Sequence, residues 1–321
     1  MKKYKPIIIV FGEPNSIFLE ILFKSLHKKI LSPIILIGSK KILEFHMKKF
    51  NFKKKILDLN SDKIENHYLS NKTINLIDIH YNFKNKFEKK ISNNSKKNIE
   101  KSFRIAFDLI KKGISNKLIN GPISKKNFLN KKYLGMTEYI SKQFKVKNQA
   151  MLIYNKKLSV CPVTTHLPIK SVSSQISKIK IIEKSKLINN FYKKNFNKKP
   201  KIAVLGLNPH CESVNKYNED EKIVKPAVNY LKNKNYLVFG PFSADTMFLL
   251  QNRSKFDVIL GMYHDQVLTP IKTIFEFDAI NLTVGLPFIR VSPDHGPNES
   301  MLGEKKSDFT SLLNSIRFLD F

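Results

Sequence analysis

Cysteine and long apolar runs are scarce in this chain of 321 residues. Its 2 cysteines, Cys161 and Cys211, are too few for a disulfide framework, so we expect a reducing compartment, the cytoplasm. No apolar run approaches the roughly 20 residues that span a bilayer. The apolar segment after the first lysines is also too short for a signal peptide. The sequence therefore predicts a cytoplasmic globular protein without a membrane partner.

Arginine is rare as well, although the formal net charge is +31. It occurs only at Arg104, Arg253, Arg290 and Arg317. A strongly positive chain suggests nucleic-acid binding, but arginine is the residue that contacts bases and phosphates in bidentate geometry. The remaining positive charges are lysines spread among asparagine, isoleucine and phenylalanine, as in KKNFLNKKY. We therefore favour a solvated lysine-rich surface and keep a nucleic-acid-binding protein as the alternative.

Glycine-rich nucleotide motifs are missing too. The sequence contains no GxGxxG and no GxxxxGK[ST], so neither a Rossmann fingerprint nor a P-loop is present. It also lacks the GxSxG elbow of serine hydrolases. Any nucleotide cofactor must be held in another way.

Short apolar runs alternate with amphipathic segments, a pattern typical of α/β proteins with parallel sheets. Strands are expected at residues 5–11, 33–38, 75–79 and 117–120, and helices from 17 to 26 and from 98 to 113. Residues 81–97, rich in lysine and asparagine, are expected to form an exposed loop. With roughly 150 residues per domain, the length indicates about two domains.

In the second half, three apolar runs each end two or three residues before a histidine. They are LSVCPV before His166, IAVLGL before His210 and DVILGM before His264. Helix-like segments at 171–196, 220–231 and 244–251 follow or separate them. Because parallel strand ends meet at one edge of a sheet, we expect the three imidazoles to converge on a divalent metal ion with positions open for substrate. The alternative is that each histidine is satisfied by its own turn.

Further polar residues lie near the last apolar runs. We interpret residues 280–289 as one buried strand that ends at Arg290, with Asp294 and His295 close behind. Lys272 and Asn281 lie between His264 and Arg290. By the same positional argument, His295 is a candidate fourth site residue.

Along nearly the whole chain lie, in order, the motifs GEPNS, NGPISK, TEY, TTHLPIKSV, GLNPH, GPFSADTMF, MYHDQ and NLTVGLPFIRVSPDHG. Together they resemble the 4-hydroxythreonine-4-phosphate dehydrogenases of vitamin B6 biosynthesis. The resemblance implies two α/β domains around a central cleft, as in isocitrate and isopropylmalate dehydrogenases. We place the first domain at residues 1–130 plus 291–321 and the second, which carries the histidines, at 131–290.

The resemblance also implies a chemistry. In the family, NAD-dependent oxidation of 4-phosphooxy-L-threonine is followed by decarboxylation to 3-amino-2-oxopropyl phosphate, in a homodimer whose metal ligands come from both subunits. NADP is the alternative cofactor, and zinc, magnesium and cobalt are the candidate metals. Carried over by motif, the metal ligands are His166, His210 and His264, and the substrate-binding residues are Met136, Thr137, Lys272, Asn281 and Arg290.

Lys272 and Asp245 are the candidate catalytic residues. Lys272 and Arg290 suit the substrate's phosphate and carboxylate. Asp245, in the SADT turn, is interpreted either as an acid–base group or a partner that orients a histidine, or as a helix N-cap.

Three positions depart from the family pattern. Met136 replaces a histidine, CESVNKYNEDE replaces a glycine-rich acidic stretch after Asn-Pro-His, and the first loop reads EPNSIF. Side chains in place of glycine change how closely a ligand approaches the backbone. A same-fold dehydrogenase acting on a threonate or erythronate 4-phosphate is therefore the alternative function.

Overall fold

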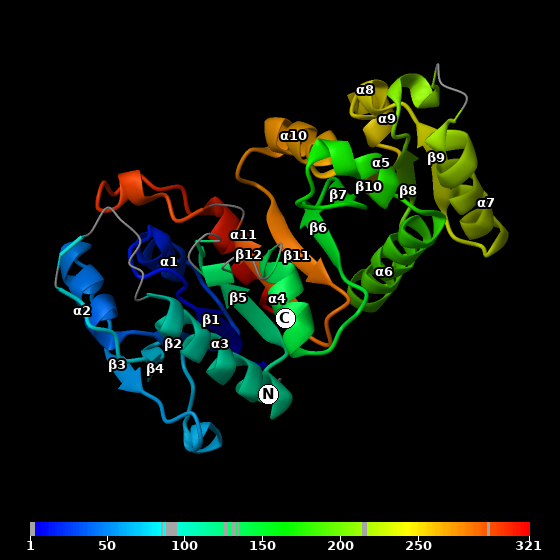
Figure 1. The fold of residues 1–321 in the computed structure, drawn as a ribbon. Coiled ribbons are helices and arrows are strands. Elements are labelled where there is room, and N and C mark those ends of the chain that lie inside the picture. Colours follow the sequence, from blue (N-terminus) through cyan, green and yellow to red (C-terminus); the bar gives the residue numbers. More distant parts are fainter. Residues whose placement is uncertain are drawn as a thin grey trace. The chain divides into compact units, whose positions relative to one another are not determined.

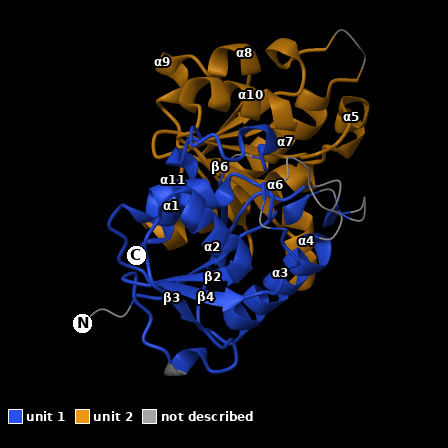
Figure 2. Ribbon diagram, turned by 90° about the vertical axis from the view of Figure 1, so that its left-hand side faces the viewer, with its two compact units in different colours: residues 1–136, 287–321 blue, residues 137–286 orange. Residues whose placement is uncertain are grey.

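The computed structural model describes residues 4–84, 86–87, 95–124, 128–129, 133, 135–213, 217–293 and 296–321 (Figure 1). The chain divides into two compact units (Figure 2). Unit 1 comprises residues 1–136 and 287–321, and unit 2 comprises residues 137–286. Unit 2 is thus an insertion in the sequence of unit 1. The domain boundaries predicted from the sequence lie instead after residues 130 and 290.

Unit 1 is built on parallel strands. Their order in the sheet is β3 (Ile56–Asp58), β4 (Ile74–Asp78), β2 (Ile34–Gly38), β1 (Ile7–Val10), β5 (Lys117–Asn120) and β12 (Ile289–Pro293). Every adjacent pair in this order is parallel. All residues of β1 and β2 are buried, as expected for continuous apolar runs in the middle of a parallel sheet.

Helices cover this sheet. They are α1 (Phe18–Leu26), α2 (Lys40–Lys49), α3 (Ser95–Lys111) and α11 (Thr310–Leu319). Helix α3 packs against β1 and β2, and α11 packs against β5 and β12. Short 3₁₀ turns lie at η1 (Ile64–Asn66) and η6 (Glu299–Met301).

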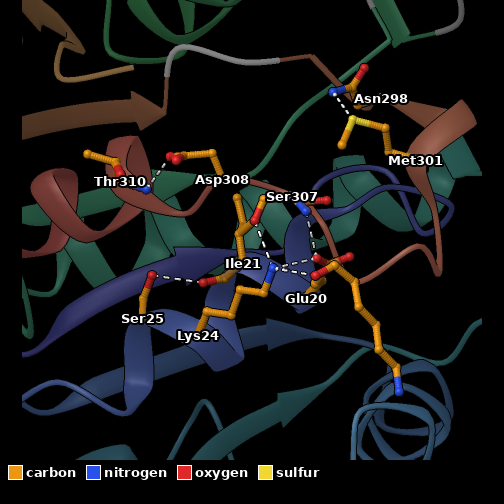
Figure 3. Close-up of polar contacts among 10 residues, drawn as sticks. Glu20, Ile21, Lys24, Ser25, Asn298, Met301, Ser307, Asp308 and Thr310 are labelled. Atoms are coloured by element: carbon orange, nitrogen blue, oxygen red, sulfur yellow. Dashed lines mark hydrogen bonds and ion pairs between the residues drawn. The ribbon is translucent and has the colours of Figure 1, made fainter. Parts of the chain in front are cut away.

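A buried carboxylate joins α1 to the segment that precedes α11 (Figure 3). Glu20 accepts hydrogen bonds from the Lys24 ammonium at 2.8 Å and from the backbone N–H of Ser307 at 2.9 Å. Lys24 also donates to the carbonyl oxygens of Ser307 and Lys305, at 2.8 and 3.0 Å. These contacts therefore join the first and the last segments of unit 1 to each other.

Unit 2 has a mixed sheet. The strand order is β11 (Ile280–Val284), β6 (Ala150–Tyr154), β7 (Ser159–Pro162), β10 (Val258–Gly261), β8 (Ile202–Leu205) and β9 (Val238–Phe242). Strand β6 is antiparallel to both of its neighbours, whereas β7, β10, β8 and β9 are parallel. The predicted parallel arrangement of the three strands that precede the histidines is therefore confirmed.

Helix α4 (Met136–Gln143) precedes the first strand of unit 2. The helices that follow its strands are α5 (Val172–Gln175), α6 (Lys178–Phe196), α7 (Lys225–Asn233), α8 (Ala244–Met247), α9 (Leu250–Arg253) and α10 (His264–Phe275). Other helical turns are the 3₁₀ turns η3 (Ile169–Ser171) and η4 (Pro209–Cys211) and the π-helical turn η5 (Asp220–Val224). Val267, Leu268 and Ile271 anchor α10 in the core formed by β6, β7, β8 and β10. In the described part of the chain, no helix is both long and apolar enough to cross a membrane.

The prediction of a single strand at residues 280–289 is wrong. The structure has two strands, β11 and β12, separated by a turn at residues 285–288. Gly285 begins this turn with φ +101°, and a Cβ there would lie 2.5 Å from the Asn148 carbonyl oxygen. Only glycine fits both conditions. Arg290 consequently lies inside β12 and not beyond a strand end.

Other expected boundaries also shift. The helix expected at 171–196 is interrupted at Ile176, and α6 starts after Ser177, whose hydroxyl accepts from the Lys180 N–H at 3.3 Å. The helix expected at 244–251 consists of α8 and α9. Helix α3 begins at Ser95, inside the segment expected to be a loop.

Candidate active site

The carboxyl ends of β7, β10 and β8 lie at one edge of the sheet of unit 2, because these strands are parallel and adjacent. His166 follows β7, His264 follows β10 and His210 follows β8. Each histidine therefore lies beyond a strand end on the side where α/β proteins bind ligands.

His166 and His264 lie next to each other. Their ring centroids are 5.5 Å apart, with 41° between the ring planes. His264 is the first residue of α10, and its Nδ1 lies 2.7 Å from Oδ1 of Asp265. This contact favours the tautomer with a proton on Nδ1 and directs the lone pair of Nε2 to another partner.

His210 is not part of this pair. It lies exposed in η4 with φ 57°, and Cys211 has φ 61°. Within the residues that the structure describes, no three His, Cys, Asp or Glu side chains are gathered as they are in a metal site. The expected convergence therefore holds for two histidines within one chain, while the third occupies a separate turn. His295, the fourth candidate, falls outside the described residues.

The turn that carries His210 is held by a buried carboxylate. Asp220, 1% exposed, accepts from the backbone N–H of Leu207 at 2.6 Å and from that of Asn208 at 3.0 Å. Glu219 accepts from the Asn208 side chain at 3.1 Å and from the Ser173 hydroxyl at 2.5 Å. The Ser173 hydrogen bond is the main reason that the pKa of Glu219 is lowered.

Asp245 lies in α8, which packs against η4. Its side chain is exposed, and Oδ1 accepts from the backbone N–H of Thr246 at 2.8 Å. Ser243, not Asp245, occupies the N-cap position. Burial is the main cause that raises the pKa of Cys211, followed by the charges of Asp220 and, further down, Asp245. Asp245 therefore accepts a hydrogen bond from the first turn of its own helix.

The substrate-binding candidates of unit 2 include Thr137 and Asn281. The hydroxyl of Thr137 lies 3.3 Å from that of Thr283 on β11. Asn281 is two residues from Thr283, so the two side chains point to the same face of β11. Oδ1 of Asn281 is buried and has no hydrogen-bond partner among the residues that the structure describes. This is unusual for a buried polar atom, and a ligand contact would satisfy it. Lys272 is exposed on α10.

In unit 1, Arg290 and Asn120 join neighbouring strands. Arg290 is 3% exposed, and its Nε donates to Oδ1 of Asn120 at 2.8 Å. Asn120 ends β5 and begins the NGPISK motif. Met136, the remaining candidate of this unit, is half-buried and is the first residue of α4.

The motifs GEPNS and NGPISK contact each other at the carboxyl ends of β1 and β5. A Cβ on Gly12 would lie 2.4 Å from the Pro122 carbonyl oxygen, so the loops approach through their backbones. Glu13 is buried and accepts from the Ser124 N–H at 3.1 Å. Burial raises the pKa of Glu13.

Sequence reasoning did not single out Thr164 and Gln266, which link strand ends to one another, or Asp220, which holds the turn after β8. The Gln266 side chain contacts the backbone of Met262 and Gly206, both at 2.7 Å, and the Thr164 hydroxyl donates to the Met262 carbonyl at 2.7 Å. Thr164 and Gln266 lie in the TTHLP and YHDQ motifs, and this position was the only sign in the sequence that they have a role. Their partners are backbone groups, so no residue type in the sequence indicates them.

Comparisons with known proteins agree with these motifs. The chain is 38% identical over 321 residues to 4-hydroxythreonine-4-phosphate dehydrogenase of Sulfurihydrogenibium sp. (strain YO3AOP1), covering 96% of this chain and 95% of that protein. The protein of the same name from Aquifex aeolicus is 34% identical over 326 residues, with 98% of each chain covered. D-threonate 4-phosphate dehydrogenase of Pectobacterium atrosepticum is 34% identical over 186 residues, 58% of this chain and 57% of that protein.

Solved structures show the same relationship. The crystal structure of 4-hydroxythreonine-4-phosphate dehydrogenase from Klebsiella pneumoniae matches with a TM-score of 0.83 and 27% identity over 98% of each chain. A β-decarboxylating dehydrogenase from Thermococcus kodakarensis, 10% identical over 98% of this chain and 81% of that chain, shares the fold with a TM-score of 0.50. Residues 29–319 match the family model described as pyridoxal phosphate biosynthetic protein PdxA, and this chain belongs to that family.

Proposed function

We propose that the protein is an NAD-dependent dehydrogenase that oxidises 4-phosphooxy-L-threonine at its hydroxyl carbon and releases carbon dioxide to give 3-amino-2-oxopropyl phosphate, in the cytoplasm. The name of relatives that match almost the whole chain supports this activity. The single structural observation that carries it is the His166–His264 pair beyond two adjacent parallel strands.

The separation of this pair fits a common metal ion. Two imidazoles bound to one tetrahedral zinc ion at their nitrogens have ring centroids about 5 Å apart, close to the 5.5 Å between His166 and His264. Nitrogen ligands suit zinc or cobalt better than magnesium. When bound, such an ion supplies Lewis-acid chemistry that eases loss of the hydroxyl proton and polarises the ketone before decarboxylation.

The protein's own residues orient the reactants. Asp265 fixes the His264 ring through the 2.7 Å contact at Nδ1. Asn120 fixes Arg290, whose guanidinium offers bidentate geometry to a phosphate or carboxylate. The unpartnered oxygen of Asn281 accepts a hydrogen bond from a substrate N–H or O–H. Lys272 supplies a positive charge on the same helix as His264, and NAD or NADP accepts the hydride.

We also propose a homodimer whose metal ligands come from both subunits. The exposed position of His210, apart from the pair in its own chain, supports this arrangement. In this arrangement, His210 of the partner subunit completes the ligand set.

A four-carbon acid phosphate is the second candidate substrate. Met136 stands where the resemblance implies a histidine, and a thioether cannot donate a hydrogen bond. Similarity to a D-threonate 4-phosphate dehydrogenase points in the same direction. A nucleic-acid-binding function receives no support from membership in this family.

The test is an assay of the purified protein with 4-phosphooxy-L-threonine or D-threonate 4-phosphate, NAD or NADP, and added Zn²⁺, Co²⁺ or Mg²⁺, in which cofactor reduction is followed. Cofactor reduction that requires the metal and is faster with 4-phosphooxy-L-threonine is the expected result. Faster reduction with the threonate would assign the alternative substrate, and no reduction with either would refute both activities.

A further inference from the structure

We propose that Gln266 is a positioning residue that couples the strand ends carrying the three histidines, and that it sets the His210 turn for metal binding. The inference rests on the proposed metal site. It assigns a role to a side chain that touches neither the metal nor the substrate.

The first link joins β10 to β7 through the backbone of Met262. Oε1 of Gln266 accepts from the Met262 N–H at 2.7 Å. The Met262 carbonyl in turn accepts from the Thr164 hydroxyl at 2.7 Å and from the Thr164 N–H at 3.1 Å. Met262 is two residues before His264, and Thr164 is two residues before His166. This link fixes the segments that carry the histidine pair.

The second link joins β10 to β8. Nε2 of Gln266 donates to the Gly206 carbonyl at 2.7 Å, four residues before His210. A single side-chain amide thus uses its acceptor on one strand end and its donor on another. Of the side chains of this length, only glutamine carries both an amide donor and a carbonyl acceptor.

The second link acts on the His210 turn, whose backbone conformation is unusual. His210 and Cys211 both have positive φ, at 57° and 61°. Consecutive residues other than glycine adopt this conformation only where the surrounding structure imposes it. Asp220 holds the N–H groups of Leu207 and Asn208, and Gln266 holds the carbonyl of the preceding Gly206. Asp220 therefore attaches the His210 turn to η5, and Gln266 attaches it to α10.

The fold of α10 does not depend on these bonds. Val267, Leu268 and Ile271 bury the helix in the core of unit 2. Gln266 is half-buried at the start of the helix, beside this apolar face. Replacing it should therefore change the position of the strand ends more than the stability of the unit.

The test measures Co²⁺ binding to the full-length protein by calorimetric titration, beside the thermal unfolding temperature. Gln266→Met removes both hydrogen bonds at similar side-chain length, and Gln266→Glu removes only the donor to Gly206. Gln251→Met, an exposed position on α9, is the matched control. We expect both Gln266 variants to bind Co²⁺ at least tenfold more weakly, as is usual when groups that orient metal ligands are lost. Their unfolding temperatures should stay close to that of Gln251→Met.

A double-mutant cycle separates positioning from a general structural effect. In a His210→Ala background, Gln266→Glu, which keeps the Met262 bond and loses only the Gly206 bond, should weaken Co²⁺ binding less than twofold, because the residue that the Gly206 bond positions is gone. An equal loss in both backgrounds, or wild-type affinity in the Gln266 variants, would overturn the coupling while leaving the metal site intact. Wild-type protein that binds no Co²⁺ would instead overturn the metal site itself, and the coupling with it.

Discussion

Nε of Arg290 donates to Oδ1 of Asn120 across 2.8 Å, joining β12 and β5 inside unit 1. Both side chains are buried, at 3% exposure each. A guanidinium in such a site is oriented before any ligand arrives, so little side-chain entropy is lost on binding.

Arg290→Lys tests whether this orientation serves the substrate. Lysine cannot form the bond to Asn120 through Nε or contact an anion in bidentate geometry, so about 1.5–3 kcal/mol should be lost, roughly a ten- to hundredfold drop in kcat/KM. The exposed Arg317→Lys on α11 is the control and should retain wild-type kinetics. If kcat/KM is the same in both variants, Arg290 does not contact the substrate.

Metal removal should abolish turnover. Dialysis against a chelator should inactivate the protein and added Zn²⁺ or Co²⁺ should restore it, because the proposed chemistry needs a Lewis acid. His166→Ala and His264→Ala should each prevent this recovery, whereas the exposed His80→Ala should behave as wild type. Full activity of protein shown by elemental analysis to be metal-free would contradict the proposal.

Mixing inactive variants tests the shared site. Hybrid dimers of His210→Ala and His264→Ala chains contain one intact site if His210 comes from the partner subunit, so activity should recover to a fraction of wild type. Hybrids of His166→Ala and His264→Ala should stay inactive, because these two rings belong to one pair in one chain. Recovery in the second mixture, or a fully active monomer in light scattering, would count against this arrangement.

Met136→His tests whether the methionine at the start of α4, where the family pattern has a histidine, weakens substrate binding. An imidazole can donate a hydrogen bond to an anionic oxygen where a thioether cannot, a difference of roughly 1–3 kcal/mol. We expect KM for 4-phosphooxy-L-threonine to fall about tenfold with kcat changed only a few fold. An unchanged or raised KM would mean that Met136 serves packing.

His46 predicts a pH dependence of stability. Its ring is buried among Phe45, Phe50 and Phe87, and burial lowers its pKa from 6.5 to about 4. The unfolded chain therefore takes up a proton first as the pH falls below 6.5, and the folded state loses stability down to a pH of about 4, by about 3 kcal/mol in total.

The variant His46→Phe should lack this loss, because it removes the titrating group while preserving an aromatic ring. Urea unfolding at pH 7 and pH 4 measures the free energy of unfolding lost between these pH values, and the exposed His80→Phe is the control. If wild type and His46→Phe lose the same free energy of unfolding between these two pH values, His46 is not the group responsible.

Much of the strand framework could be predicted from the sequence, because continuous apolar runs such as IIIV in β1 have few structures available other than a buried parallel strand. The pairing of β6 with β11 could not, since antiparallel partners far apart in the chain leave no periodic signal. Likewise, Gly285 looks like any glycine inside an apolar run until its neighbour Asn148 is known.

Within the candidate site, residue type and distance from a strand end predicted the His166–His264 pair. The same reasoning could not place His210, because its turn is shaped by backbone bonds to Asp220 and Gln266. Side chains that bind the main chain of distant segments have no recognisable partner in the sequence.

The insertion of unit 2 between Met136 and Pro287 has a consequence for the order of events on the ribosome. Unit 2 is one continuous segment, so its sheet can assemble as soon as residue 286 has left the exit tunnel. Unit 1, although its first strands are made earlier, must wait for β12 to pair with β5 and for α11 to pack against both. The part of the chain translated second is therefore the first that can complete its fold, the reverse of the usual N-terminal-first sequence.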